Sequence, residues 1–200
     1  MANSLISTSG YGESAAALVE QYESVTFAEV HREMLGLLPA APARVLDIGA
    51  GSGRDAAELA RRGHRVVAAE PTPELLALGR EIHADQPVEW VADALPELAE
   101  LRGAGRRFDL VLLTAVWMHL DAGERAESMA SLAELLAPEG RVLLTLRHGP
   151  VPPGRRMFDV SAAETAALAG RHGLRLIHHG ERPDPHDRPG VHWSHLALQR

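Results

Sequence analysis

The sequence predicts an α/β protein with a mostly parallel sheet covered by helices on both faces. Short apolar runs of strand length alternate with stretches of helical periodicity. Strands joined by helical crossovers run parallel and are buried on both faces. The five expected strands are 44–48, 65–69, 87–91, 108–114 and 140–147. The helices expected between them are 53–62, 73–84 and 123–136.

The elements outside this alternation complete one domain over residues 1–200. Residues 13–37 are expected to form an N-terminal helical extension or lid, with a break near Val25-Thr26. After the core at 44–147 comes an irregular loop at 148–160, rich in proline and glycine. The C-terminal part, 161–200, has a helical pattern at 161–171 and two strand-like runs, Leu174–His179 and Val191–Gln199.

The composition is that of an ordinary globular chain, with 46% hydrophobic and 24% charged residues. No apolar run reaches the roughly 18 residues that a membrane span needs, and the N-terminus has no secretion-signal pattern. There is no cysteine, so neither a disulfide nor thiolate chemistry is possible. We therefore expect a cytoplasmic protein without a membrane partner, as a monomer or a homodimer.

The net charge disfavours nucleic acid as a partner. The formal charge is −7, and acidic residues lie among the arginine pairs. A protein that binds a nucleic-acid backbone needs clustered positive charge to displace counterions. The sequence therefore favours a small-molecule ligand.

A glycine-rich turn follows the first strand. Asp47 precedes Gly49, Gly51 and Gly53, and an acidic residue, Glu70, ends the next apolar run. Alternate glycines let the backbone approach a ligand closely at a helix start, where unpaired amides face it. A dinucleotide site would place its third glycine one residue later, where this chain has Arg54.

The segment Val45–Gly53 resembles the first motif of the class I S-adenosylmethionine-dependent methyltransferases. The resemblance extends from about 44 to 147 through Pro71–Glu74, Ala92–Leu95, Phe108–Thr114 and Leu136–Leu144. It implies a Rossmann-like, seven-stranded sheet in which the last strand runs antiparallel between the fifth and sixth.

The resemblance also implies S-adenosyl-L-methionine as the cofactor and a site for it. Asp47 would hold the loop or reach the cofactor's amino group, Glu70 would accept from the ribose hydroxyls, and Asp93 would accept from the adenine. Capping of a helix is the alternative role of Asp93. The implied cofactor residues are Asp47, Gly49, Ala50, Gly51, Gly53, Glu70, Pro71, Asp93, Ala94, Leu95, Thr114, Ala115 and Val116.

His119 is the candidate general base, because it lies just beyond the fourth strand and an unperturbed histidine titrates near pH 6.5. A structural hydrogen bond to a neighbouring loop is the alternative role. Trp117 is expected either to wall the substrate pocket or to lie in the core. Arg54 and Asp55 are expected to pair with each other or with the N-terminal segment, without a catalytic part.

The acceptor is expected to lie between the N-terminal extension and the loop after the fifth strand. Tyr11, Tyr22 and His31 belong to the extension, and a pair of arginines in the loop suits a carboxylate or phosphate. A solvated pair is the alternative. The candidate acceptor residues are Tyr22, His31, Trp117, His148, Arg155 and Arg156, and the scattered C-terminal histidines do not predict a metal site.

We therefore predict a methyltransferase that acts on a small molecule. A non-catalytic S-adenosylmethionine-binding protein and, less compatibly with Arg54, an NAD(P)-dependent oxidoreductase are the alternatives.

Overall fold

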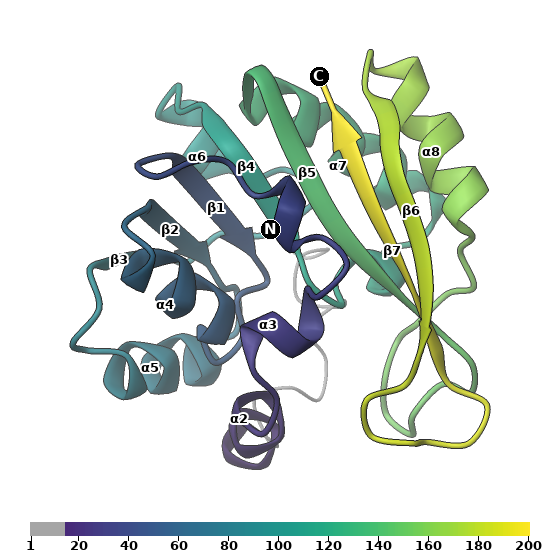
Figure 1. Cartoon of the computed structure of the whole chain (residues 1–200), viewed down its shortest axis with the longest axis horizontal. Coiled ribbons are helices and arrows are strands. Elements are labelled where there is room, and N and C mark those ends of the chain that lie inside the picture. Colours follow the sequence, from purple (N-terminus) through teal and green to yellow (C-terminus); the bar gives the residue numbers. More distant parts are fainter. Residues whose placement is uncertain (1–14) are drawn as a thin grey trace.

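The computed structural model describes residues 15–200, and a seven-stranded sheet forms its centre (Figure 1). The strand order is β3-β2-β1-β4-β5-β7-β6. The strands are β1 Arg44–Ile48, β2 Arg65–Ala69, β3 Val88–Val91, β4 Phe108–Leu113, β5 Leu136–His148, β6 Arg175–Pro183 and β7 His192–Gln199. The first five run parallel, whereas β7 runs antiparallel between β5 and β6, which confirms the predicted topology.

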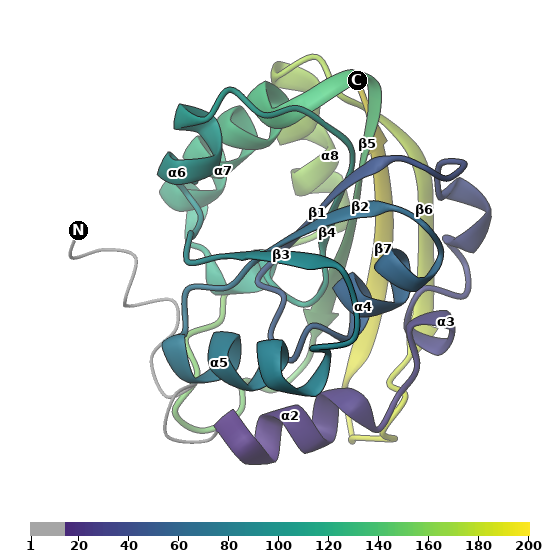
Figure 2. The ribbon, with the colours of Figure 1, turned by 90° about the vertical axis from the view of Figure 1, so that its left-hand side faces the viewer.

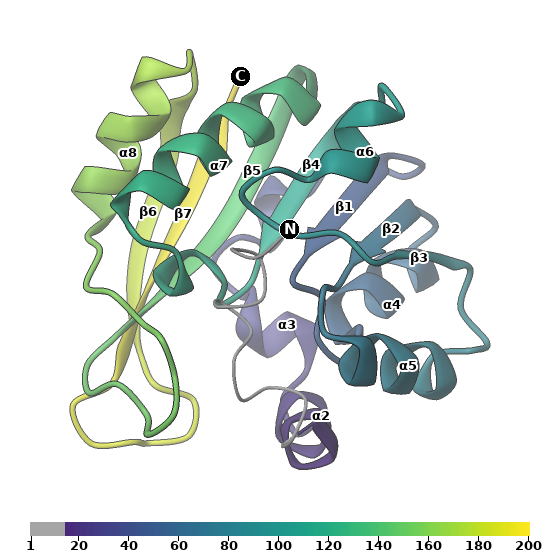
Figure 3. The ribbon, with the colours of Figure 1, turned by 180° about the vertical axis from the view of Figure 1, so that it is seen from behind.

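Helices cover both faces of the sheet (Figures 1 and 2). On one face, α6 (Ala99–Gly103), α7 (Ala122–Leu135) and α8 (Ala162–Arg171) pack over a core that includes Leu101, Leu132 and Leu168 (Figure 3). On the other face, α3 (Phe27–Val30) and α4 (Arg54–Arg61) pack through Phe27 and Leu59. The short helices α6 and η3 (Trp117–His119) were not predicted.

The N-terminal extension consists of short helices. α2 (Ala15–Glu23) packs on α5 (Pro73–Ile82) through Val19 and Leu75, and η2 is Leu35–Leu37. The predicted break is confirmed at Thr26, whose side chain accepts from the Glu29 amide while the Glu29 carboxylate accepts from the Thr26 amide. Tyr11 lies outside the described residues.

The fifth strand begins four residues earlier than predicted. Leu136 already pairs with Phe108, and the register then shifts before Arg141 pairs with Leu110. Glu139 has a left-handed φ of 61° within this irregularity. The residues before Arg141 therefore form a bulge within the strand. No helix among residues 15–200 is long and apolar enough to cross a membrane.

Candidate active site

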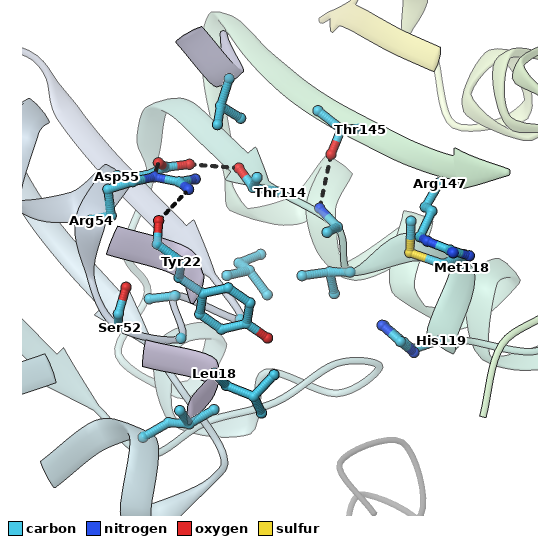
Figure 4. A pocket seen from close by; sticks show the side chains of 18 of the residues that line it. Leu18, Tyr22, Ser52, Arg54, Asp55, Thr114, Met118, His119, Thr145 and Arg147 are labelled. Carbon is cyan, nitrogen blue, oxygen red and sulfur yellow. Dashed lines mark hydrogen bonds and ion pairs between the residues drawn. The ribbon is translucent and has the colours of Figure 1, made fainter. Parts of the chain in front are cut away.

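A cavity of about 390 Å³ opens at the carboxyl ends of β1, β2, β4 and β5. This volume is within the range of small-molecule sites, and the edge is where open α/β sheets bind ligands. Tyr22, from α2, points into the cavity, and His119 faces it from the opposite side (Figure 4). Most predicted cofactor residues line it: Asp47, Gly49, Ala50, Gly51, Glu70, Pro71, Asp93, Ala94, Leu95, Thr114, Ala115 and Val116.

The glycine loop brings the backbone close to the cavity. Gly49 and Gly51 have left-handed φ angles of 66° and 59°. A Cβ on Gly49 would lie 2.6 Å from Cγ2 of Val116, and one on Gly51 would lie 3.1 Å from the Tyr22 ring. Both positions therefore require glycine for conformation and for space.

Gly53 differs from Gly49 and Gly51, because it does not line the cavity. It is the N-cap of α4, with a φ of 87°, and a Cβ there would lie 2.5 Å from the Trp90 ring. The third glycine of the motif therefore serves the packing of the turn on β3, and its part in holding the cofactor stays a prediction.

Glu70 ties the glycine loop to the end of β2. The side chain is buried, and its two oxygens accept from the Gly51 and Thr72 amides, each at 2.8 Å. Burial raises the pKa of this carboxyl, while the two amide bonds oppose the shift. Each carboxylate oxygen has a second lone pair, so Glu70 retains acceptor capacity for hydroxyl groups.

Asp47 has a buried carboxylate beside the same cavity. Its Oδ2 atom has no hydrogen-bond partner within residues 15–200. Burial, together with the nearby Asp55 and Glu70 carboxylates, raises its pKa well above the usual value, although Arg54 opposes this. A buried acceptor without a donor is costly, so this oxygen fits a cationic donor such as the amino group of S-adenosyl-L-methionine.

Asp93 lies on the loop between β3 and α6. Its carboxylate accepts from the Ala94 amide and from the Leu101 amide, each at 3.0 Å. These bonds support the alternative that the sequence left open, in which Asp93 caps the backbone at α6. The adenine contact stays a prediction.

Asp55 is the centre of a buried polar network beneath the glycine loop. It accepts from Thr114 Oγ1 and contacts Nε2 of His31, each at 2.7 Å, and Arg54 Nε donates to it at 2.7 Å. Arg54 also donates to the Tyr22 carbonyl. Burial pushes the pKa of Asp55 upward, but His31 and Arg54 outweigh this effect and hold it below its usual range. The predicted pairing of Arg54 and Asp55 is confirmed.

This network corrects the prediction that His31 contacts the acceptor. The residue is 2% exposed and does not line the cavity, because its ring turns inward to Asp55. His31 therefore holds α3 against α4 and is not available to an acceptor.

The end of β4 is held in a strained conformation. Ala115 has a φ of 59°, which L-residues rarely adopt, and its amide donates to Thr145 Oγ1 on β5 at 2.9 Å. Such strain is typical of functional loops that the surrounding structure holds in place. It places Ala115 and Val116 on the cavity wall.

His119 lines the cavity and also bonds to the loop after β5. Its Nδ1 lies 2.7 Å from the Arg156 carbonyl, which only accepts, so Nδ1 carries the proton and Nε2 is the basic nitrogen of the neutral ring. Burial lowers the pKa of His119, and the charges of Arg155, Arg147 and Arg156 lower it further against the carbonyl bond. The ring is therefore neutral near pH 7.

Three further acceptor candidates are placed away from the cavity, whereas Tyr22 and Arg155 line it. Trp117 is fully buried in the core. Arg156 pairs with Asp121 and Glu124 at 3.0 and 2.7 Å. His148 bonds to Ser194 at 2.8 Å and stacks on His192. Each of these three side chains is engaged in packing or pairing with its neighbours.

The sequence did not indicate the remaining wall of the cavity. It comes from the end of β5 and from the β6–β7 hairpin: Arg147, Arg182, Pro185, His186, Arg188 and Trp193. The only available signal was the density of arginine after residue 146, since these residues form no contiguous motif.

Residues 45–140 match the family model described as "Methyltransferase domain". Over this core the chain is similar to the class I S-adenosylmethionine-dependent methyltransferases. An uncharacterized methyltransferase of Mycobacterium tuberculosis is 35% identical to this chain over 113 residues, which are 53% of this chain and 40% of that protein. A ubiquinone biosynthesis O-methyltransferase of Cereibacter sphaeroides is 34% identical over 124 residues, covering 62% of this chain and 49% of that protein. The chain thus spans less than half the length of these relatives.

Solved structures share the fold of this chain. A TehB-like methyltransferase from Corynebacterium glutamicum has a TM-score of 0.68 at 18% identity, covering 94% of this chain and 98% of that one. The 1,6-didemethyltoxoflavin-N1-methyltransferase of Burkholderia thailandensis has a TM-score of 0.64 at 24% identity, covering 94% and 89%. That structure contains 1,6-didemethyltoxoflavin and S-adenosylhomocysteine.

Proposed function

We propose that this protein transfers a methyl group from S-adenosyl-L-methionine to a small-molecule acceptor. The observation that carries the proposal is the cavity at the carboxyl edge of the sheet, where the glycine loop, Asp47 and Glu70 meet the ends of β4 and β5. Relatives named for ubiquinone biosynthesis and demethylmenaquinone methylation support a small organic acceptor. The net charge of −7 also favours a small molecule over nucleic acid.

The cofactor end of the cavity suits a cationic ligand with hydroxyl groups. Asp47 supplies an acceptor for an ammonium group, and Glu70 supplies acceptors for paired hydroxyls. When bound, S-adenosyl-L-methionine would supply a methyl group on a positively charged sulfur, and this sulfur would leave as a neutral thioether when the acceptor takes the methyl group. Ala115 and Val116 lie where the cavity passes from the cofactor end to the acceptor end.

The protein's own contribution is alignment, exclusion of water and removal of a proton. Tyr22 and Leu18, on α2, cover the cavity as part of a lid that we assign to the N-terminal extension. Nε2 of His119 takes the proton of an acceptor hydroxyl or amine, because the lowered pKa keeps this nitrogen unprotonated at neutral pH. The Arg156 carbonyl holds the ring in the required tautomer.

Calorimetric titration with S-adenosylhomocysteine, with NAD as the parallel titration, tests the cofactor assignment. We expect micromolar binding of the former alone. Transfer of labelled methyl groups to small acceptors then separates an enzyme from a non-catalytic binding protein. Absence of S-adenosylhomocysteine binding by the folded protein would reject the proposal.

Two pairs of variants locate the site. Gly51→Ala and Glu70→Gln are expected to weaken S-adenosylhomocysteine binding at least about tenfold, because they change the loop and its carboxylate. Gly105→Ala is the matched control for the first, since Gly105 also has a positive φ, of 63°, but has open space around it. Glu74→Gln, on an exposed position of α5, is the control for the second. Equal affinities within each pair would contradict the site.

A further inference from the structure

Two arginines and a tryptophan form a row across the acceptor end of the cavity. Arg147 on β5 is the register partner of Trp193 on β7, and Trp193 is the register partner of Arg182 on β6. Register partners on neighbouring strands present their side chains on the same face of a sheet. All three residues line the cavity. Trp193 therefore has an arginine beside it on each neighbouring strand, and we call these three residues the Arg147–Trp193–Arg182 row.

The positive charges of this row have no carboxylate partners. Arg147 donates to the Pro150 carbonyl at 2.8 Å and Arg182 to the Glu29 carbonyl at 2.6 Å, and neither forms an ion pair within the described part of the chain. The Nε–H of each is buried without a hydrogen-bond partner there. Several other arginines do form ion pairs, for example Arg44 with Asp109 at 2.8 Å and Arg106 with Glu89 at 2.6 Å. The row thus has uncompensated charge and unused donors.

The nearest acids do not remove this charge. Asp184 accepts from Arg188 Nε and Nη2 at 2.8 and 2.7 Å, and from the Trp193 indole at 2.8 Å. It therefore neutralises Arg188 and orients the indole. Glu33 lies 3.5 Å from His195 Nδ1. Despite the influence of both acids, burial lowers the pKa of Arg147 and of Arg182, which means that their charged forms are under-stabilised.

We infer that the methyl acceptor carries an oxyanion, a carboxylate or a phosphate, which binds to the Arg147–Trp193–Arg182 row. The planar fork of arginine matches both groups, and the indole offers an apolar surface for the body of the molecule. The inference rests on the proposed methyl transfer. It names different residues from the sequence-predicted pair, of which Arg156 is taken up by Asp121 and Glu124.

The charge distribution also orients such an acceptor. Asp47 and Glu70 at the cofactor end repel an anion, whereas the row attracts it. The nucleophilic part of the molecule would then point away from the row, toward the part of the cavity wall that Val116 and His119 line. The oxyanion therefore selects the acceptor and fixes its direction in the cavity.

The test is a calorimetric titration of the full chain with benzoate, phenyl phosphate and benzamide, with and without S-adenosylhomocysteine. Benzamide has the shape of benzoate without the charge. We expect both anions to bind at least about tenfold more tightly than benzamide. The ratio of benzoate to phenyl phosphate affinity distinguishes a carboxylate from a phosphate acceptor. Equal binding of benzoate and benzamide, or no anion binding at millimolar concentration, would overturn the inference.

Variants assign the effect to the row. Arg147→Gln and Arg182→Gln should each reduce anion affinity about tenfold, and the double variant should bind anion and amide equally. Arg175→Gln, at the exposed far end of β6, removes the same charge away from the cavity and should change nothing. Arg182→Lys retains the charge and should recover part of the affinity. Unchanged anion preference in the double variant would overturn the inference.

Two controls separate this inference from the proposed function and from unfolding. Arg182 also holds α3 through the Glu29 carbonyl, so unfolding temperatures are compared for all variants. Affinity for S-adenosylhomocysteine should stay the same in all of them. If the wild-type protein does not bind S-adenosylhomocysteine at all, the proposed function fails, whereas the titrations without it still report on the oxyanion site.

Discussion

The end of the cavity beneath β1, β2 and β3 presents carboxylates, whereas the end beneath β5, β7 and β6 presents guanidinium groups. Asp47 and Glu70 belong to the first end, and Arg147 and Arg182 to the second. The first end suits a cationic ligand with hydroxyl groups, and the second suits an anion. If the proposed cofactor and acceptor bind here, the polarity of the cavity would direct each of them to a different end.

The two ends also differ in how the chain builds them. At the proposed cofactor end, the glycine loop, Asp47 and Glu70 belong to strands and the turns that follow them, with Gly49 and Gly51 in left-handed conformations. At the acceptor end, the contacts come from residues that an antiparallel hairpin brings beside β5. Turns have local sequence signatures, whereas strand register brings together residues that are far apart in the chain. The residues proposed for the cofactor end could therefore be predicted from the sequence, whereas those proposed for the acceptor end could not.

The largest expected effect concerns the frame of the cofactor end. Asp55→Ala leaves His31, Arg54 and Thr114 without their shared buried partner, and we expect a loss of about 3–5 kcal/mol in the free energy of unfolding. Urea denaturation at pH 7 measures it, with Asp85→Ala at an exposed position as the control. Equal stability of the two variants would show that the network does not hold this end together.

The pH dependence of this loss has a definite sign. The pKa of Asp55 is lowered in the folded state, so its stabilising contribution is fully present above the ordinary aspartate value of about 3.9. The contribution is lost as the pH falls from there toward the lowered folded-state pKa. The difference between wild type and Asp55→Ala should therefore narrow below about pH 4.

The second effect concerns His119, which lies between the two ends. His119→Gln should reduce methyl transfer about 100-fold, with unchanged affinity for S-adenosylhomocysteine, because the base is lost while a donor to the Arg156 carbonyl remains. Rates of labelled methyl transfer measure it. Full activity of the variant would leave His119 only its bond to the loop.

The pH profile connects His119 to the cationic end. Since the pKa of His119 is lowered, the acid limb of kcat should lie below pH 6.5, with activity falling as the ring is protonated. Arg147→Gln removes a neighbouring positive charge and should move this limb to higher pH. Arg175→Gln should not move it. If the acid limb lies at the same pH in both variants, the charge of Arg147 does not influence the pKa of His119.

The smallest expected effect combines a gain in stability with a loss of ligand affinity at the cofactor end. Asp47→Asn removes a buried carboxyl group whose pKa is raised. The free energy of unfolding at pH 7 should therefore increase by about 1 kcal/mol, or about 2–4 °C in Tm. The gain should shrink as the pH falls and should disappear well below the ordinary aspartate pKa of about 3.9, where the wild-type carboxyl is protonated in both states. S-adenosylhomocysteine affinity should fall. Scanning calorimetry compares the variant with Asp85→Asn, and a lower Tm would show that the charge stabilises the fold.

Individual residues show why only part of the site was predictable. Gly49 and Gly51 face the cavity as the motif implied, but the similar Gly53 packs on Trp90, because helix α4 turns it away. Trp117 and His119 are two residues apart, yet the helix η3 buries the first and leaves the second on the cavity wall. His31 turns inward because its partner, Asp55, lies on another element, α4. Each outcome depends on contacts between residues that are far apart in the sequence.

Most of the alternation of strands and helices, the glycine turn and its two acids follow from the sequence alone. They rest on periodicity and on turn conformations, which neighbouring residues determine. Only the tertiary structure decided the irregularity at Glu139, the network around Asp55 and the Arg147–Trp193–Arg182 row. These features arise from strand register and from the packing of separate elements. Burial then sets the pKa values of the carboxylates, the histidine and the arginines, because desolvation depends on what surrounds a group in space.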